Sequence, residues 1–472
     1  MQFMEAQALS PRIWPLYIAT FLSTYIFAVA NISVPGMQAA LDIPGSRTTL
    51  VIGAYSVSFA AGLIICGRLG DNFGRRRLFR IGTLSILVTS VLTALAPTLG
   101  FLVLGRLLQG CAAALTTPQI LSSIQATLRG RARIRAISGY SIFAGVGTIG
   151  GNIVGGTINS MFPVEYGWRA SLLSIAVIAA IAWAGTGYLA ESKSNAPEGF
   201  DFPGSGLVAA SLLCLITGLT NASALDPINP LRTPGMLAMT LGLLLASAVG
   251  FFLLARHLLN RELSKLPSVL PLHVITEPAV RVGMVLAALF FLMLSSFMYN
   301  YAILTQQGFG WNPLASGLSL LVLAASFVLV STFATRLLAA FGPRVLIVGA
   351  VFQATGLSVL AVFAFADLQP FILWFQLTAV LIGGGQGLMF GPLISVVMNH
   401  VPNRVAGLTG GLIATAQQAG MGIGVATLSS MFTVLIALLP VHTAFGLVVC
   451  ASIVCSLAFA AVASRLLGQH AE

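Results

Sequence analysis

Residues 48–66 read TTLVIGAYSVSFAAGLIIC, residues 67–77 read GRLGDNFGRRR, and residues 78–96 read LFRIGTLSILVTSVLTALA. The first and last segments are predominantly apolar, and each has close to the roughly 20 residues that an α-helix needs to cross about 30 Å of hydrocarbon. The segment between them is short, basic and rich in glycine. Together the three segments predict two membrane-spanning helices joined by a tight basic turn.

The composition places the whole chain in the same environment. Of its 472 residues only 7% are charged and 57% are hydrophobic, and the mean hydropathy is +0.96. A soluble domain of this length cannot keep such a balance in water. The net charge of +11 does not indicate a nucleic-acid partner, because no basic tract exceeds Arg75–Arg77. The five cysteines lack metal-ligand spacing, and we expect neither a metal nor a cofactor.

Apolar runs of spanning length recur along the chain, and their continuous apolarity predicts helices rather than barrel strands. We expect an all-α membrane protein with fourteen transmembrane helices, arranged as two six-helix bundles with two inserted central helices. The predicted domains are an N-terminal bundle (1–192), an inserted helix pair (193–265) and a C-terminal bundle (266–472). The expected spans lie near 13–34, 48–66, 78–96, 99–128, 136–158, 169–190, 204–223, 236–256, 280–304, 314–336, 345–365, 371–398, 405–435 and 443–466.

The basic residues predict the orientation of these helices. With a cytoplasmic N-terminus, 19 of the 23 lysines and arginines fall in segments on the cytoplasmic side, as the positive-inside rule requires. The first apolar run is of full spanning length and lacks a cleavage signature, so we interpret it as an uncleaved helix. We therefore expect a multi-pass protein of the bacterial inner membrane with both termini in the cytoplasm.

An internal repeat supports the two-bundle arrangement. Residues 68–80 align with residues 336–348 at a shift of 268, and both segments lie between the second and third helices of their six-helix groups. Two parallel repeats of this kind relate the halves of one large class of transporters.

The turn at residues 67–77 resembles the loop signature of the major facilitator superfamily, G-x-L-x-D-x-x-G-R-[RK], and it has the expected place between helices two and three. The alternative is a generic basic loop, which needs neither spaced glycines nor an aspartate. The resemblance implies that this loop is a conformational latch, with functional residues Gly67, Asp71, Gly74, Arg75 and Arg76.

Helix four carries a second resemblance to the same superfamily. Arg106, Gln109 and Gly110 match its motif R-x-x-Q-G, in which the arginine projects into the protein interior. A buried arginine costs on the order of 3 kcal/mol on insertion scales unless it is paired, hydrated or facing a cavity. Two interpretations stay open: Arg106 contacts substrate or takes part in coupling, or it binds backbone carbonyls of helix one and holds the bundle together.

Helices one and five resemble the fourteen-helix drug/proton antiporter branch, with departures. Gly147, Gly151, Gly155 and Gly156 fit the helix-packing motif G-x-x-x-G-P-x-x-G-G, but Asn152 stands where that motif has proline. Helix one ends N-x-x-x-P at Asn31–Pro35, and Ile26 occupies the position where the branch has an aspartate. These departures favour a facilitative or uptake carrier as the alternative to proton-coupled export.

The ionisable residues do not identify a proton carrier. All twelve acids and all five histidines map to loops, termini or helix ends, so any coupling would use an end-placed acid, Asp71 or Glu277, or a proton on the substrate. The candidate groups for substrate or coupling are therefore polar residues in the spans. They are Tyr25, Asn31, Arg106, Gln109, Asn152, Asn300, Tyr301, Gln386 and Gln417.

The resemblance implies a secondary transporter rather than an enzyme. It would export a small organic compound or drug by proton antiport with alternating access. Its partners would be a small-molecule substrate, membrane lipid and protons, with no nucleic acid, and one copy holds both halves of a transport unit, so we expect a monomer.

Overall fold

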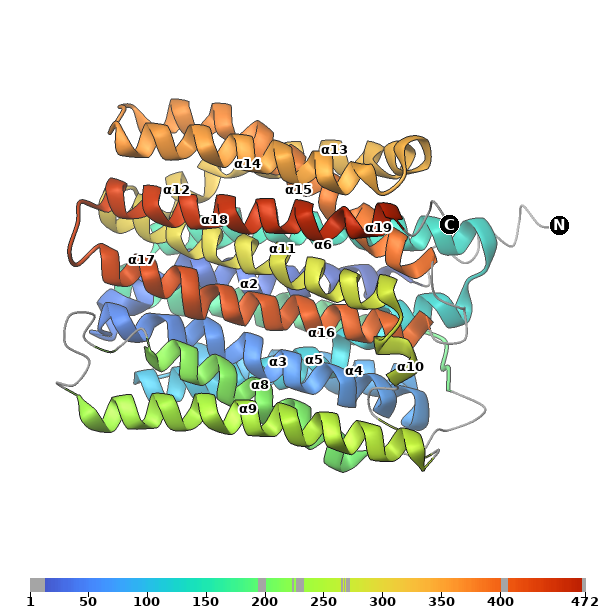
Figure 1. Cartoon of the computed structure of the whole chain (residues 1–472). Helices are drawn as coiled ribbons and strands as arrows, with labels where there is room; N and C mark the ends of the chain where they lie inside the picture. Colours follow the sequence, from blue (N-terminus) through green and yellow to red (C-terminus); the bar gives the residue numbers. More distant parts are fainter. Residues whose placement is uncertain are drawn as a thin grey trace.

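The computed structural model describes residues 13–193, 201–222, 225, 233–264, 266, 268, 272–399 and 406–468. Within these residues the regular elements are helices, and the long ones run side by side (Figure 1). The first group comprises α2 (Trp14–Ala40), α3 (Gly45–Phe73), α4 (Arg75–Ala94), α5 (Leu99–Thr127), α6 (Gly130–Met161) and α7 (Val164–Ala184), which the 3-10 turn η2 (Gly185–Tyr188) follows.

The central pair consists of α8 (Phe202–Ala222) and α9 (Pro234–Leu263). The second group comprises α10 (Leu272–Ile275), α11 (Pro278–Ile303), η4 (Leu304–Gly308), α12 (Pro313–Ser319), α13 (Leu321–Phe341), α14 (Arg344–Phe365), α15 (Phe371–Asn399), α16 (Ala406–Gly424), η5 (Val425–Ser429), α17 (Ser430–Leu435), α18 (Val441–Ala463) and α19 (Arg465–Gly468).

Thirteen helical segments of the described chain are long and apolar enough to cross a membrane. A further helix, α3, is 29 residues long, and it packs between α5 and α16. The expected all-α membrane fold with two six-helix bundles and an inserted helix pair is confirmed.

The two groups repeat one pattern of helix packing. In the first, α2 packs on α6 and α3 packs on α5; in the second, α11 packs on α16 and α13 packs on α15. The predicted repeat has a backbone counterpart, because Gly74 and Gly342, 268 residues apart, both end a helix with a positive φ, at 103° and 61°. Only glycine adopts such angles without strain, so both turns require it.

Three of the expected spans are less regular than hydropathy indicated. The span near 314–336 is two helices that meet at Leu320, the span near 280–304 continues into the π-helical segment η4, and the span near 405–435 contains the π-helical segment η5. Hydropathy measures apolarity only, and a π-helical turn is as apolar as the α-helix around it. Such turns concentrate at functional positions in helices.

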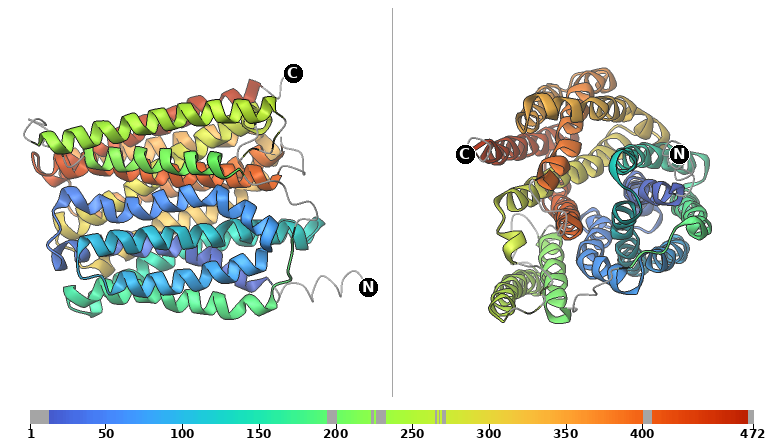
Figure 2. Two further views of the ribbon diagram at one scale, coloured as in Figure 1. Left: turned by 90° about the horizontal axis from the view of Figure 1, so that it is seen from below. Right: turned by 90° about the vertical axis from the view of Figure 1, so that its right-hand side faces the viewer.

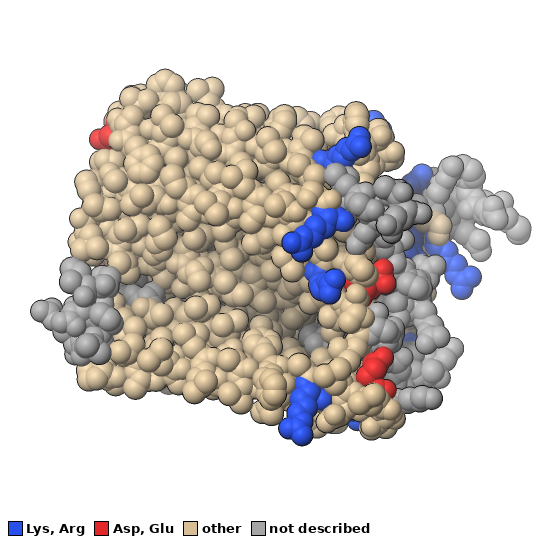
Figure 3. Space-filling view, in the orientation of Figure 1, with Lys and Arg blue, Asp and Glu red and all other residues tan. Residues whose placement is uncertain are grey.

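Charge separates the two ends of the molecule. On the face shown in Figure 3, lysine and arginine gather at one end and the broad middle is uncharged. This end, which we call the basic end, holds the helix termini near Arg75, Arg133, Arg256, Arg336 and Arg344. The opposite end, which we call the far end, holds the α2–α3, α4–α5 and α6–α7 turns.

Glycines set the distance between α2 and α6. An added Cβ at Gly147 would lie 2.3 Å from the carbonyl oxygen of Phe21, and one at Gly151 would lie 2.6 Å from the Cβ of Ala28. An added Cβ at Gly155 would lie 2.8 Å from Cγ2 of Ile32. The seam therefore works by direct backbone contact, as small-x-x-x-small motifs do in membranes.

We expect Gly151→Val to destabilise the protein, because the side chain has no room between α2 and α6. Overpacking of this kind costs about 1–3 kcal/mol. The matched control is Gly242→Val on α9, where an added Cβ meets no atom within 4 Å. The measurement is thermal unfolding in detergent, followed by a thiol-reactive dye in a background that keeps the buried Cys66 and replaces the other four cysteines, of which Cys111 is exposed. Equal melting temperatures for the two variants would contradict the packing argument.

Candidate functional site

Arg106 is fully buried on α5, two helical turns from the N-terminus of that helix, which lies at the far end of the molecule. Its Nε donates to the carbonyl oxygen of Val51 at 3.2 Å, and its Nη1 donates to Oε1 of Gln109 at 2.6 Å. The guanidinium carbon lies 4.5 Å from the ring centroid of Tyr55. The backbone carbonyl it binds belongs to α3, the second helix, and not to helix one as the structural alternative expected.

The hydrogen bonds around Arg106 continue into α4. Gln109 donates through Nε2 to Oγ of Ser90 at 2.8 Å, and Ser90 donates to the carbonyl oxygen of Ile86 at 2.6 Å. The Arg106 cluster, by which we mean Val51, Tyr55, Ser90, Arg106 and Gln109, thus joins α3, α4 and α5. It supplies the dipoles and the aromatic face that a buried cation needs, without a carboxylate among these contacts.

Two polar atoms of this cluster have no hydrogen-bond partner. They are Nη2 of Arg106 and the hydroxyl oxygen of Tyr55, and both are buried. An unsatisfied buried donor costs about 1–3 kcal/mol, so the cluster holds unused capacity to bind an acceptor. The matching acceptor chemistry is a carbonyl, carboxylate or water oxygen.

The two candidate tyrosines are held inside their own bundles. The hydroxyl of Tyr25 lies 2.6 Å from Oγ of Ser174 on α7, and that of Tyr301 lies 2.5 Å from Oγ of Ser319 on α12. Tyr301 also packs on Phe375, with 4.6 Å between ring centroids. Both hydroxyls therefore have protein partners.

Asn31 and Asn300 occupy equivalent places in the two groups, 269 residues apart. Both are buried, at 1% and 2% exposure, and both have a buried Oδ1 without a partner. Asn31 uses its Nδ2 to bind the carbonyl oxygen of Phe27 in its own helix. Of the remaining candidates, Gln386 is buried on α15 and Gln417 is half-buried on α16. The structure brings Arg106 and Gln109 into direct contact, and their further hydrogen bonds go to α3 and α4 rather than to the other candidates.

The loop signature at Gly67–Arg76 is built around a carboxylate that the sequence did not single out. Oε1 of Glu191 accepts from the backbone N–H of Arg76 at 3.1 Å, at the first turn of α4, where a helix attracts negative charge. A Cβ on Gly74 would lie 2.8 Å from the same oxygen. Arg75 donates its backbone N–H to the carbonyl oxygen of Ser192 at 3.1 Å. The side chain of Asp71, the expected acid of the latch, lies outside the described residues.

A second unexpected carboxylate is buried at the basic end of α8. Oδ1 of Asp201 lies 2.8 Å from Nε2 of His257 and 3.0 Å from Nη2 of Arg261, both on α9, and accepts the backbone N–H of Gly204 at 3.0 Å. The side chain of Asp201 is fully buried. The sequence places it correctly at a helix end, but its burial depends on α9 and cannot be read from the sequence.

The two bundles meet at the far end through neutral polar groups. Gln306 donates to the carbonyl oxygen of Ile32 at 3.0 Å, and Gln307 donates to Oε1 of Gln38 at 3.0 Å. The backbone N–H of Leu314 donates to Oγ of Ser160, also at 3.0 Å. These three contacts, which we call the far-end contacts, join the two halves. Their residues lie at helix ends and carry no charge, so the sequence alone does not reveal them.

Within the described residues no three histidine, cysteine, aspartate or glutamate side chains come together as a metal site. The Arg106 cluster presents a buried cation and an unpartnered donor, Nη2 of Arg106, to an acceptor.

Comparison with known proteins agrees with this arrangement. The family described as the Major Facilitator Superfamily matches residues 16–425. The chain is 30% identical over 436 residues to the tetracenomycin C resistance and export protein of Streptomyces glaucescens, which covers 90% of this chain and 76% of that protein. It is also 30% identical over 438 residues to the puromycin resistance protein pur8 of Streptomyces alboniger, covering 90% and 83% of the two chains.

Among solved structures, the fold matches the xylose transporter XylE from E. coli in a partially occluded inward-open conformation. The TM-score is 0.63 at 15% sequence identity, and the match covers 94% of this chain and 95% of the other. At this identity the likeness concerns the fold alone.

The Arg106 cluster gives a prediction about stability. Arg106→Ala leaves Oε1 of Gln109 without its donor and opens a cavity, so we expect a clear loss of thermal stability. The double variant Arg106→Met, Gln109→Leu replaces the polar pair by apolar side chains, and we expect its unfolding free energy to stay within about 1 kcal/mol of wild type or to exceed it. Detergent melting curves measure both. A double variant as unstable as Arg106→Ala would show that the polar pair is needed for folding.

Proposed function

The chain belongs to the major facilitator superfamily, and from this membership we propose that it exports a small organic compound across the bacterial inner membrane in exchange for protons. The observation that carries the proposal is that two relatives matched over 90% of the chain are a resistance and export protein and a resistance protein for antibiotics. Both antibiotics in those names are small organic molecules. This supports export of a compound of the same general class.

Alternating access is the mechanism that we infer for this export. The far-end contacts hold Gln306 and Gln307 of the second bundle against α2 of the first. Parting the bundles there breaks these three neutral contacts and the packing of α2 residues such as Phe27 and Val34 on the second bundle, but it leaves each bundle's own helix packing intact, so the bundles can move as rigid bodies. In this proposal residues 1–192 and 266–472 are the two moving units, and the described conformation is the one closed at the far end.

The orientation follows from the basic end. By the positive-inside rule this end faces the cytoplasm, so both termini are cytoplasmic and the far end faces outward. A single chain contains both bundles, and we propose that it works as a monomer surrounded by lipid. The loop at Gly67–Arg76 then acts on the cytoplasmic side as the latch, with Glu191 bound to its helix end.

We assign the central role in substrate recognition or coupling to Arg106. It is a charged residue inside a predicted span, and its Nη2 and the neighbouring Tyr55 hydroxyl are the unpartnered groups that an incoming acceptor would satisfy. Asn31, Asn300, Asn152, Gln386 and Gln417 supply further neutral polar groups along the path. The packing glycines Gly147, Gly151, Gly155 and Gly156 keep the helices close enough to exclude water.

Proton coupling has to use an unusual carrier. Ile26 occupies the place of an expected aspartate, and the acids lie at helix ends and in loops. Asp71, Glu277 or a proton on the substrate are the candidates. The absence of an aspartate at this place also favours the second candidate function, a facilitative or uptake carrier for a small metabolite, neutral or anionic, without proton coupling.

The test measures transport of puromycin, chosen as the probe compound, in vesicles with and without an imposed pH gradient. We expect gradient-driven export by wild type, and its loss in the double variant Arg106→Met, Gln109→Leu, whose folding is checked by its melting curve. Gly242→Val on the exposed helix α9 is the control and should transport normally. Flux that ignores the gradient would reject antiport and favour the facilitative carrier. Gradient-driven flux in the double variant would remove Arg106 from the mechanism.

A further inference from the structure

The last turn of α3 contains a glycine that the loop signature does not require. The signature G-x-L-x-D-x-x-G-R-[RK] fixes glycine at positions 67 and 74 and leaves position 70 open, where this chain has Gly70. In the aligned turn of the second bundle this position is Leu338. A glycine inside a helix lowers stability relative to alanine. The reason for Gly70 lies on the neighbouring helix α5.

The side-chain amide of Gln119 fills the space that Gly70 leaves. Gln119 is buried on α5, at 1% exposure, and a Cβ added to Gly70 would lie 2.6 Å from its Cδ and 2.8 Å from its Nε2. Real Cβ atoms do not approach other atoms so closely, so the amide needs glycine at position 70. Both helices belong to the first bundle, whose helices group together when the molecule is seen from the basic end (Figure 2).

One hydrogen bond fixes the amide in this place. Nε2 of Gln119 donates to the backbone carbonyl oxygen of Cys66, one turn before Gly70 on α3, at 2.8 Å. A carbonyl oxygen accepts only from the NH₂ group, which sets the orientation of the amide. Oε1 of Gln119 then lies against Gly70 and has no hydrogen-bond partner, although it is buried. Because an unsatisfied buried acceptor lowers stability, the amide is not the group that stability alone selects.

The same part of α5 also holds the start of α4. Nη1 of Arg75 donates to the backbone carbonyl oxygen of Ser122 at 3.3 Å, and Ser122 follows Gln119 by three residues, on the same face of the helix. This part of α5 is firmly packed, because Ile120 shares a buried apolar cluster with Phe79 of α4. The helix α5 therefore contacts the loop both before and after its aspartate.

We propose that Gln119 is a positioning residue of the cytoplasmic latch. Its side-chain amide, held against Gly70 by the carbonyl oxygen of Cys66, sets where the last turn of α3 lies on α5. Because Asp71 follows Gly70 directly, this contact also sets the position of the acid of the signature. The functional meaning of the contact rests on the proposed latch, whereas the contact itself is tested without transport.

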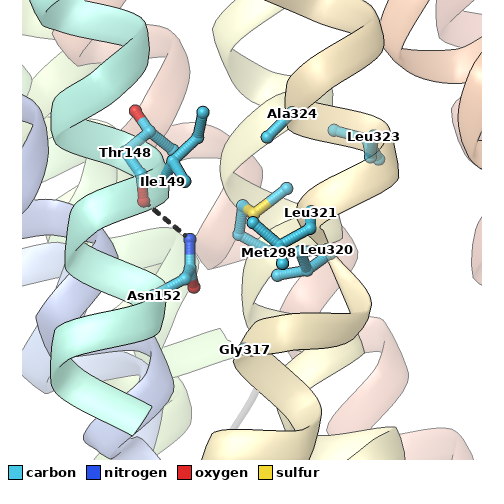
Figure 4. A pocket seen from close by; sticks show the side chains of 9 residues that line it. All are labelled: Thr148, Ile149, Asn152, Met298, Gly317, Leu320, Leu321, Leu323 and Ala324. Atoms are coloured by element: carbon cyan, nitrogen blue, oxygen red, sulfur yellow. Dashed lines mark hydrogen bonds between the residues drawn. The ribbon is translucent and has the colours of Figure 1, made fainter. Parts of the chain in front are cut away.

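The Gln119 contact is separate from the groups assigned to the substrate. Arg106 precedes Gln119 by 13 residues on α5, which is roughly 20 Å along the helix at 1.5 Å per residue. The pocket between the bundles is lined by Thr148, Ile149 and Asn152 of α6 and by the second bundle, and its described lining includes no residue of α3, α4 or α5 (Figure 4). An effect of Gln119 on transport therefore comes through the loop.

The first experiment measures amide hydrogen exchange of the full chain in lipid nanodiscs. Gln119→Met keeps a long side chain and removes the donor. We expect about fivefold faster exchange at residues 70–74, as for the loss of one neutral hydrogen bond, and no change in the aligned turn at residues 338–342. Gln125→Met, at a half-buried glutamine further along α5, is the control and should change neither turn. Unchanged exchange at residues 70–74 in Gln119→Met would overturn the proposal.

Melting curves of the same variant separate positioning from packing. Met removes an amide whose Oε1 has no partner, and the carbonyl oxygen of Cys66 keeps its helical partner because α3 continues to Phe73. We therefore expect the melting temperature of Gln119→Met to equal or exceed that of wild type. A lowered melting temperature would make Gln119 an ordinary packing residue and would contradict the positioning role.

A variant of the glycine tests the same contact from the other helix. Gly70→Ala forces the amide away from the carbonyl oxygen of Cys66, so we expect the faster exchange at residues 70–74 again. The double variant Gly70→Ala, Gln119→Ala should exchange no faster than Gly70→Ala, because both changes remove one contact. Gly242→Ala on α9, where a Cβ meets no atom within 4 Å, is the control. Additive increases would show that Gly70 and Gln119 act separately, against the proposal.

Export of puromycin from vesicles then tests the latch itself. We expect the maximal rate of Gln119→Met to fall roughly threefold or more, with an unchanged half-saturating concentration, because a conformational step is affected and the substrate groups are not. Faster exchange with an unchanged maximal rate would overturn the role in the latch and leave the export function standing. Wild type that exports nothing would refute the proposed function, and the exchange and melting results would still decide the contact.

Discussion

Hydrocarbon offers no hydrogen-bond partner to the peptide backbone, and this constraint decides most of the structure. Every span must satisfy its own N–H and C=O groups, so the chain folds as long helices, and irregular backbone is tolerated only where protein covers it. The interruptions obey this rule. The π-helical segment η5 and the break at Leu320 lie in spans that pack against other helices, whereas η4 lies at the end of its span. Buried hydroxyls such as Thr305 and Ser316 hydrogen-bond beside the break and η4.

The same constraint explains how an arginine survives in the interior. Arg106 cannot remain solvated there. Its guanidinium group instead donates to a backbone carbonyl of α3 and to the side-chain amide of Gln109 in its own helix, and it lies over the ring face of Tyr55. Each partner is neutral, so the cluster keeps a net positive charge in an apolar core. A cation compensated by dipoles alone attracts an electron-rich group more strongly than one neutralised by a carboxylate.

The sequence predicted the helices well, because hydropathy reports directly on the medium that surrounds them. It also placed the loop at Gly67–Arg76 and singled out Arg106, since a charge in an apolar run is conspicuous. It did not reveal that Glu191 binds the start of α4, that Asp201 is buried against α9, or that Gln307 meets Gln38. Such pairs are more than 50 residues apart in the chain, and their side chains are ordinary at helix ends. Tertiary packing alone brings them together.

The neutrality of the far-end contacts has a thermodynamic consequence. Amide and hydroxyl hydrogen bonds contribute about 1 kcal/mol each, so the three contacts add a bias of about 3 kcal/mol to that of the apolar packing between α2 and the second bundle. Because none of them is an ion pair, salt does not screen this bias. In the proposed alternating-access cycle, the hydrogen-bonded part of the bias therefore stays the same whatever the ionic composition of the medium at the far end.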